Sequence, residues 1–178
     1  KNAPSIQEMM EEYDEPILKP LLDVKATTFA APMSFTLEFP FEPNEYFTNS
    51  VLTKVYGLKC VPDPEDVFSF EGPEIVIAKG CTIDWKIGTN VPVKTIKKKQ
   101  KHKSRGAVRT VTKPVQNVSF FNFFSPPAVT ANIEEMDEET HYILNNDFVV
   151  GYLLNDRVIP HAVLFFSGEF MVVVVYDE

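Results

Sequence analysis

The sequence predicts a single α+β domain on three observations. Apolar residues recur at helical spacing near the N-terminus, alternate with polar residues through the middle, and return to helical spacing towards the C-terminus. With 178 residues, 44% of them hydrophobic, the chain can bury roughly 70% of the surface that it exposes when unfolded. We therefore expect one domain over residues 1–170, with a helical start over 5–26, a sheet and basic hairpin over 33–115, and a helical end over 119–169. We assign no structure to the tail, residues 171–178.

The first helix is predicted by a capping box, in which Ser5 is followed three residues later by Glu8. Apolar residues at helical spacing give this helix a buried stripe, and four glutamates fall on its opposite side. Pro16 suits the first position of a second helical segment, and Pro20 bends it. The apolar stripe consists of Ile6, Met9, Met10, Tyr13 and Ile17, and the acidic stripe of Glu8, Glu11, Glu12 and Glu15.

The middle of the chain predicts strands. From Pro32 to Phe41 the apolar residues alternate with other residues, as a strand with one covered face requires. Residues 52–60 and 74–85 predict two further strands, the second interrupted at 79–80. Residues 91–103 and 107–115 predict the two strands of a long hairpin, whose tip carries cations.

The last third of the chain predicts helices. Residues 119–125 place four phenylalanines on one face of a short helix that Pro126 ends, which predicts a core anchor. Residues 147–167 have helical apolar spacing. Pro160 is placed to open a last helix and Gly168 to close it.

Charge is distributed unevenly along the chain. The formal net charge is −8, but nine of the 17 cationic residues lie between positions 94 and 113, where there is no carboxylate. A second acidic segment lies between Lys113 and Arg157, which have no cationic residue between them. The pattern indicates an acidic body with one basic arm, and the acidic body argues against nucleic acid as the main ligand.

The residues that usually carry catalysis or bind metals form no recognisable pattern. The three histidines are far apart in sequence, without ligand-spaced Cys, Asp or Glu, and the seven glycines form no phosphate-binding loop. Two cysteines make neither a zinc site nor a disulfide framework, and no apolar run is long enough to cross a bilayer. We therefore expect no enzyme, no metal, no cofactor and no membrane association.

Seven short stretches of the chain follow one another in the order of a known family. They are YDEPILK (13–19) with Leu22 and Asp23, SFTLEF (34–39) leading to PNEYF (43–47), IDW (83–85), KKKQKH (97–102), SFFNFFSP (119–126) and IPHAVLFFSG (159–168). Together they resemble the nucleosome assembly protein (NAP) family of histone chaperones. The resemblance implies an antiparallel β-sheet of about four strands packed by helices on one face, plus a protruding basic β-hairpin. The family's upstream dimerisation helix and acidic C-terminal tail have no counterpart in these residues, and we expect a homodimer for the full-length form.

For function, the resemblance implies a histone chaperone. Acidic surfaces would bind core histones, with linker histone as a further candidate, shield them from non-specific DNA contact, and assist nucleosome assembly and histone transport. On composition alone such acidic stripes are more often solvated helix faces. The residues expected to bind histones are Glu8, Glu11, Glu12, Asp14, Glu15, Asp23, Glu134, Glu135, Asp137, Glu138 and Glu139.

The basic arm has three interpretations: a solvated strand end, a nuclear-import signal or a nucleic-acid patch. No aromatic residue lies between positions 94 and 113, so a stacking surface for single strands is missing, and we expect no direct specific nucleic-acid contact. The resemblance implies an import signal, hence an import receptor as partner and shuttling between nucleus and cytoplasm. The residues concerned are Lys97, Lys98, Lys99, Lys101 and Lys103.

A second hypothesis for the whole domain stays open at this point. The same charge distribution suits a general acidic adaptor, which would act as an import carrier for basic proteins other than histones. Nothing in the sequence selects one histone pair over another.

Overall fold

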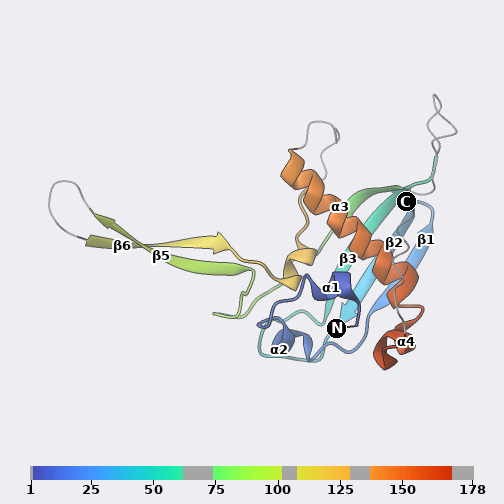
Figure 1. The fold of residues 1–178 in the computed structure, drawn as a ribbon, viewed down its shortest axis with the longest axis horizontal. Coiled ribbons are helices and arrows are strands. Elements are labelled where there is room, and N and C mark those ends of the chain that lie inside the picture. Colours follow the sequence, from blue (N-terminus) through green and yellow to red (C-terminus); the bar gives the residue numbers. More distant parts are fainter. Residues whose placement is uncertain (1, 62–73, 102–107, 129–136, 170–178) are drawn as a thin grey trace.

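A computed structural model describes residues 2–61, 74–101, 108–128 and 137–169. Its centre is a four-stranded antiparallel sheet with strand order β1-β2-β3-β4, and a separate two-stranded sheet extends from it (Figure 1). The four strands are β1 Lys25–Ala30, β2 Met33–Pro40, β3 Val51–Lys59 and β4 Glu74–Lys79. The predicted α+β class is confirmed.

One face of the sheet carries the core. In β2, Phe35, Leu37 and Phe39 are buried, as their alternation predicts, and helices cover this face (Figure 1). The register pairs these residues with Tyr56, Lys54 and Leu52 of β3, in that order. Directly paired residues point to the same face, so Lys54 enters the core at a position where an apolar side chain is usual.

Strand β1 lies where the sequence pattern does not predict a strand. The predicted helical region ends at residue 26 and the predicted sheet begins at residue 33, whereas residues 25–30 pair with β2 along their whole length. The strand is mostly exposed, with Phe29 half-exposed, so its residues show no alternation of the kind that marks a half-buried strand. Strand β1 is therefore defined by its backbone pairing rather than by a buried face.

The helices before the sheet are shorter than predicted. Helix α1 (Pro4–Gln7) begins with a proline after Ala3, and no side chain caps it, so the predicted Ser5 capping box is wrong. Helix α2 (Glu15–Leu18) buries Ile17. Turns replace the continuous helix. Four members of the predicted apolar stripe still pack on the core, and Tyr13 is exposed; the four are Ile6, Met9, Met10 and Ile17.

The predicted aromatic anchor is confirmed. It forms the 3₁₀ helix η2 (Phe120–Phe124), and its four phenylalanines are buried. Phe124 lies edge-on to Phe39 of β2, with ring centroids 5.2 Å apart, and Phe121 lies edge-on to Trp85 at the same separation. Such pairs each contribute about 0.5–1.5 kcal/mol beyond the burial of their area.

The C-terminal helical region begins earlier than predicted. Helix α3 (Glu138–Tyr152) is capped by Asp137, whose side chain accepts the Thr140 N–H, and it continues into the π-helical segment η4 (Leu153–Val158). Helix α4 (Ala162–Ser167) ends at Gly168, which has a φ of 75° as its predicted capping role requires.

The basic hairpin is confirmed as a protruding element. Strands β5 (Val93–Lys101) and β6 (Val108–Gln116) pair over their full length and extend away from the four-stranded sheet (Figure 1). The tip, residues 102–107, lies outside the described residues.

A buried ion pair joins the sheet to the helices. Lys54 is 0% exposed and Asp147 of α3 is 8% exposed, and Lys54 Nζ lies 2.6 Å from Asp147 Oδ1. Lys54 Nζ also donates to the Phe123 carbonyl at 2.5 Å, and the Tyr56 hydroxyl donates to the Asp147 carbonyl at 3.1 Å. One lysine therefore connects β3, η2 and α3.

Burial works against both charges of this pair. It lowers the pKa of Lys54 and raises the pKa of Asp147, because in each case the lost hydration outweighs the attraction between the two groups. The second carboxylate oxygen of Asp147 is buried without a hydrogen-bond partner among the described residues. The pair therefore sets the position of α3 against β3, and the loss of hydration by both charges opposes the stability that the pair contributes.

Removing one partner should be strongly destabilising. We expect Lys54→Met to lower the free energy of unfolding by about 3–5 kcal/mol, because Asp147 then stays buried without a countercharge. Urea denaturation followed by circular dichroism measures this. The double variant Lys54→Met/Asp147→Leu should recover most of the loss, and a double variant no more stable than the single one would contradict the role assigned to the pair.

Candidate functional site

The first group of carboxylates lies around α1 and α2. Glu8, Glu12 and Glu15 are exposed, Glu11 is half-buried, and Asp23 is exposed just before β1. Glu8 to Asp14 follow α1 in turns rather than in a continuous helix, so the predicted single stripe is broken. The apolar neighbours face the core, and most of these carboxylates face solvent.

The second group opens α3. Asp137, Glu138 and Glu139 are exposed in its first turn, where the helix dipole favours negative charge. The Asp137 carboxylate accepts both the Thr140 N–H and the Thr140 hydroxyl at 2.8 Å, and these hydrogen bonds lower its pKa. Asp137 therefore has a structural role as well as a charge. The predicted residues Glu134 and Glu135 lie outside the described residues.

These two groups lie near opposite ends of α3. Ile6 and Met10, beside the first group, line one groove with Leu154 and Val158, which follow the C-terminal end of α3. The second group is at the N-terminal end of the helix. A helix of 15 residues is about 22 Å long, and α1 and α3 lie on the same side of the sheet (Figure 1).

Asp14 does not belong to this surface. It is 0% exposed, and its carboxylate accepts the Ser119 hydroxyl at 2.7 Å and the Phe120 N–H at 2.8 Å. It also accepts the Glu11 N–H at 3.1 Å. The expectation that Asp14 contacts a histone is therefore wrong: this carboxylate ties the first helical segment to η2.

The neighbouring Tyr13 holds the base of the basic hairpin. Its hydroxyl donates to the Val118 carbonyl and accepts from the Asn117 amide at 3.1 Å. Four of the predicted import lysines lie on β5 beyond this base, whereas Lys103 lies outside the described residues. The hairpin strands that include these lysines extend away from α1, α2 and α3 (Figure 1).

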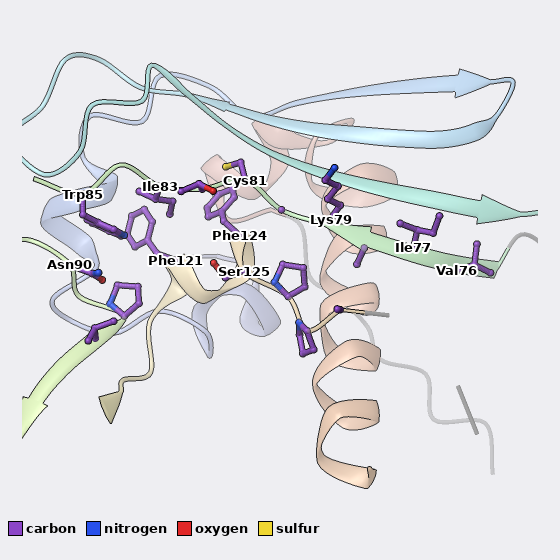
Figure 2. A pocket seen from close by; sticks show the side chains of 18 residues that line it. Val76, Ile77, Lys79, Cys81, Ile83, Trp85, Asn90, Phe121, Phe124 and Ser125 are labelled. Atoms are coloured by element: carbon purple, nitrogen blue, oxygen red, sulfur yellow. The ribbon is translucent and has the colours of Figure 1, made fainter. Parts of the chain in front are cut away.

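A separate cavity of about 1080 Å³ lies between β4, the segment that follows it, and η2 (Figure 2). Its lining is mainly apolar, with Ile77, Trp85 and Phe124 among the side chains, and Lys79 is its one charged lining residue in the described part of the chain. A Cβ atom on Gly80 would lie 1.8 Å from the Phe124 carbonyl oxygen, so glycine permits this close approach. Among the described residues no carboxylate lines the cavity, so it is separate from both acidic groups.

Two other kinds of site are absent from the described ranges. They contain no group of three or more His, Cys, Asp or Glu that could hold a metal ion, and no helix in them is long and apolar enough to span a membrane. The two described cysteines, Cys60 and Cys81, form no disulfide, and Cys60 is exposed.

The structural role of Asp14 can be tested apart from any binding role. We expect Asp14→Ala to lower the free energy of unfolding by about 2–4 kcal/mol, because two buried donors lose a charged acceptor. Thermal and urea denaturation measure this. The matched change Glu12→Ala removes an exposed carboxylate nearby and should stay within about 0.5 kcal/mol of the parent chain. Equal effects of the two changes would refute the distinction.

Comparison with known proteins places the chain in a family. The model of the nucleosome assembly protein (NAP) family matches residues 1–169. Human nucleosome assembly protein 1-like 4 is 58% identical over 171 residues, which cover 95% of this chain and 46% of that protein. Nucleosome assembly protein 1-like 1 of Xenopus tropicalis is also 58% identical, over 95% of this chain and 43% of its own length.

A solved structure agrees with these matches. Nucleosome assembly protein 1 from Plasmodium knowlesi superimposes with a TM-score of 0.66 at 27% identity, covering 95% of this chain and 64% of that one. The chain spans less than half the length of the curated relatives quoted above. Its sequence, its four-stranded sheet and its helical layer together show that it belongs to the nucleosome assembly protein family.

Proposed function

We propose that this chain is the histone-binding core of a histone chaperone. The observation that carries the proposal is the exposure of carboxylates near both ends of α3, on a scaffold that belongs to the nucleosome assembly protein family. Core histones are the partner, with linker histone as a further candidate. The chaperone would shield histones from non-specific DNA contact and assist their transport and their assembly into nucleosomes.

The proposed mechanism is competition for charge. Histone lysines and arginines neutralise DNA phosphates, and carboxylates held on a protein surface occupy the same cationic groups. A clustered negative potential speeds the encounter of oppositely charged proteins and favours cationic partners over others. The same potential is screened by salt, so binding should weaken as ionic strength rises. No chemical step is required.

The structure narrows the set of residues proposed to make these contacts. Asp14 is left out of the proposed histone contacts because it is buried. Replacing Asp137 would not test binding alone, because its carboxylate also caps α3. Glu138 and Glu139 are exposed and adjacent to it, and Glu8 and Glu12 are exposed in the first group. The proposed contacts are Glu8, Glu11, Glu12, Glu15, Asp23, Asp137, Glu138 and Glu139, together with Glu134 and Glu135 outside the described residues.

Removing charge from either group should weaken histone binding. We expect Glu8→Gln/Glu12→Gln and Glu138→Gln/Glu139→Gln each to reduce affinity for a core-histone dimer about five- to twentyfold at low salt, and to make affinity less dependent on salt. Titrations across an ionic-strength series measure both quantities.

The matched control removes two exposed carboxylates elsewhere, Glu45→Gln/Asp84→Asn, and should change affinity less than about twofold. If the control and the two test variants lose affinity equally, only net charge matters and the assigned surface is wrong. An unchanged affinity in both test variants would refute the electrostatic mechanism.

We also propose that the hairpin carries a nuclear-import signal read by an import receptor, so that the protein shuttles between cytoplasm and nucleus. The support is a run of lysines on a strand that projects from the body. A chain that travels with histones needs such a signal, and the arm keeps it apart from the acidic groups. Homodimerisation through an upstream helix remains part of the proposal for the full-length form.

The import proposal predicts a loss of nuclear accumulation. We expect a fluorescent fusion with Lys97, Lys98, Lys99 and Lys101 changed to Ala to stay in the cytoplasm, because an import receptor recognises the cluster of positive charge. Microscopy of cells expressing each fusion measures this. The control changes four exposed lysines elsewhere, Lys19, Lys25, Lys59 and Lys79, to Ala and should still enter the nucleus. Equal import of both variants would remove the assignment.

A further inference from the structure

The outward face of α3 carries apolar residues that are exposed and do not belong to the core. Its inward face packs on the sheet through Leu144, Val150 and Gly151, and a Cβ on Gly151 would lie 2.6 Å from the Tyr56 ring. On the opposite side, Tyr142 is 67% exposed and Val149 is 59% exposed. These two residues are seven positions apart, so they lie on one stripe, two turns from each other.

Negative charge continues this stripe. Glu138 lies four positions before Tyr142, hence on the same line of the helix, and it is exposed. Helix α3 contains no lysine or arginine. The first acidic group lies near the other end of the helix, across the groove that contains Ile6 and Leu154. Tyr142 and Val149 thus form an apolar ridge on the outward side of α3, with the exposed Asn145 and Asn146 between them and exposed carboxylates near both ends.

An acidic surface alone does not supply lasting affinity. Charges at an interface mainly set the rate of encounter and the choice of partner, and salt screens them. Affinity at physiological salt comes from a few well-packed side chains that lose their water, and tyrosine is among the most frequent of these. It adds large contact area at a small entropic cost, since it has only two side-chain torsions.

We propose that the ridge of Tyr142 and Val149 is the apolar anchor of the histone contact, packing against an apolar strip that lies among the lysines and arginines of a core-histone dimer. This inference rests on the proposed function and names the residues that hold the partner once charge has brought it in. Charge selects this occupant: a second copy of the chain would bring the same acidic ends against each other, and like charges across an interface are costly.

The test separates the anchor from the charges by their salt dependence. We use the full chain, a purified core-histone dimer and an ionic-strength series with Tyr142→Gln/Val149→Gln, where glutamine is at least as good a helix former as the residues that it replaces. We expect the affinity for the histone dimer to fall about tenfold, and to fall by this factor at every salt concentration, because salt does not screen an apolar contact. Tyr142→Phe should keep the affinity of the parent chain.

The matched control changes two exposed apolar residues outside α3, Ile87→Gln/Val61→Gln, and should bind within about twofold of the parent chain. Circular dichroism of every variant checks that α3 remains folded, and sedimentation of the free chain detects any change in its own association.

Each outcome decides the proposal. Unchanged affinity in the ridge variant, with salt-dependent binding by the parent chain intact, overturns the anchor and leaves the proposed function standing. An equal loss in the control, or a ridge variant that alters self-association and not histone affinity, also overturns it. If the parent chain does not bind histones at all, that result refutes the proposed function and the anchor together. If the double change unfolds α3, Tyr142→Gln alone gives the same comparison with Tyr142→Phe.

Discussion

The buried pair of Lys54 and Asp147 is the contact on which the arrangement of this domain depends. It fixes α3 against β3, and the same lysine binds the carbonyl of Phe123 in η2. Because both the Lys54 ammonium and the Asp147 carboxylate lose hydration, the pair determines where α3 lies on β3 more than it stabilises the fold. The position matters, since α3 carries one acidic group at its start and the apolar ridge along its outward face.

Carboxylates in this fold have two distinct roles that depend on burial. Asp14 and Asp147 are buried and connect elements of the core, whereas Glu8, Glu12, Glu138 and Glu139 face solvent. Asp137 has both roles, as a cap and as a surface charge. An acidic composition therefore overstates the charge available to a partner, and only the exposed carboxylates are available for the proposed histone contact. Tyr13 anchors the base of the basic hairpin, whose strands extend away from the helices that bear the acidic groups.

The sequence was informative where periodicity reflects burial. The alternation in β2, the phenylalanines of η2 and the glycine after α4 each predicted their element, because one covered face or one backbone angle demands those residues. It failed for β1, whose exposed residues show no alternation. It also failed for Lys54 and Asp14, because charged residues are almost always exposed and no neighbour in the sequence marks a buried one. The start of α3 was missed although Asp137 and Thr140 form a recognisable cap.

In the proposed function, exposed carboxylates near the two ends of α3 protect histones from DNA. The most direct measurement is the turbidity of mixed core histones and DNA at physiological salt, with increasing amounts of the chain. We expect the parent chain to keep the mixture clear, and a chain with glutamine at Glu8, Glu12, Glu138 and Glu139 to leave it turbid at equal concentration. Equal clearing by the two chains would contradict the claim.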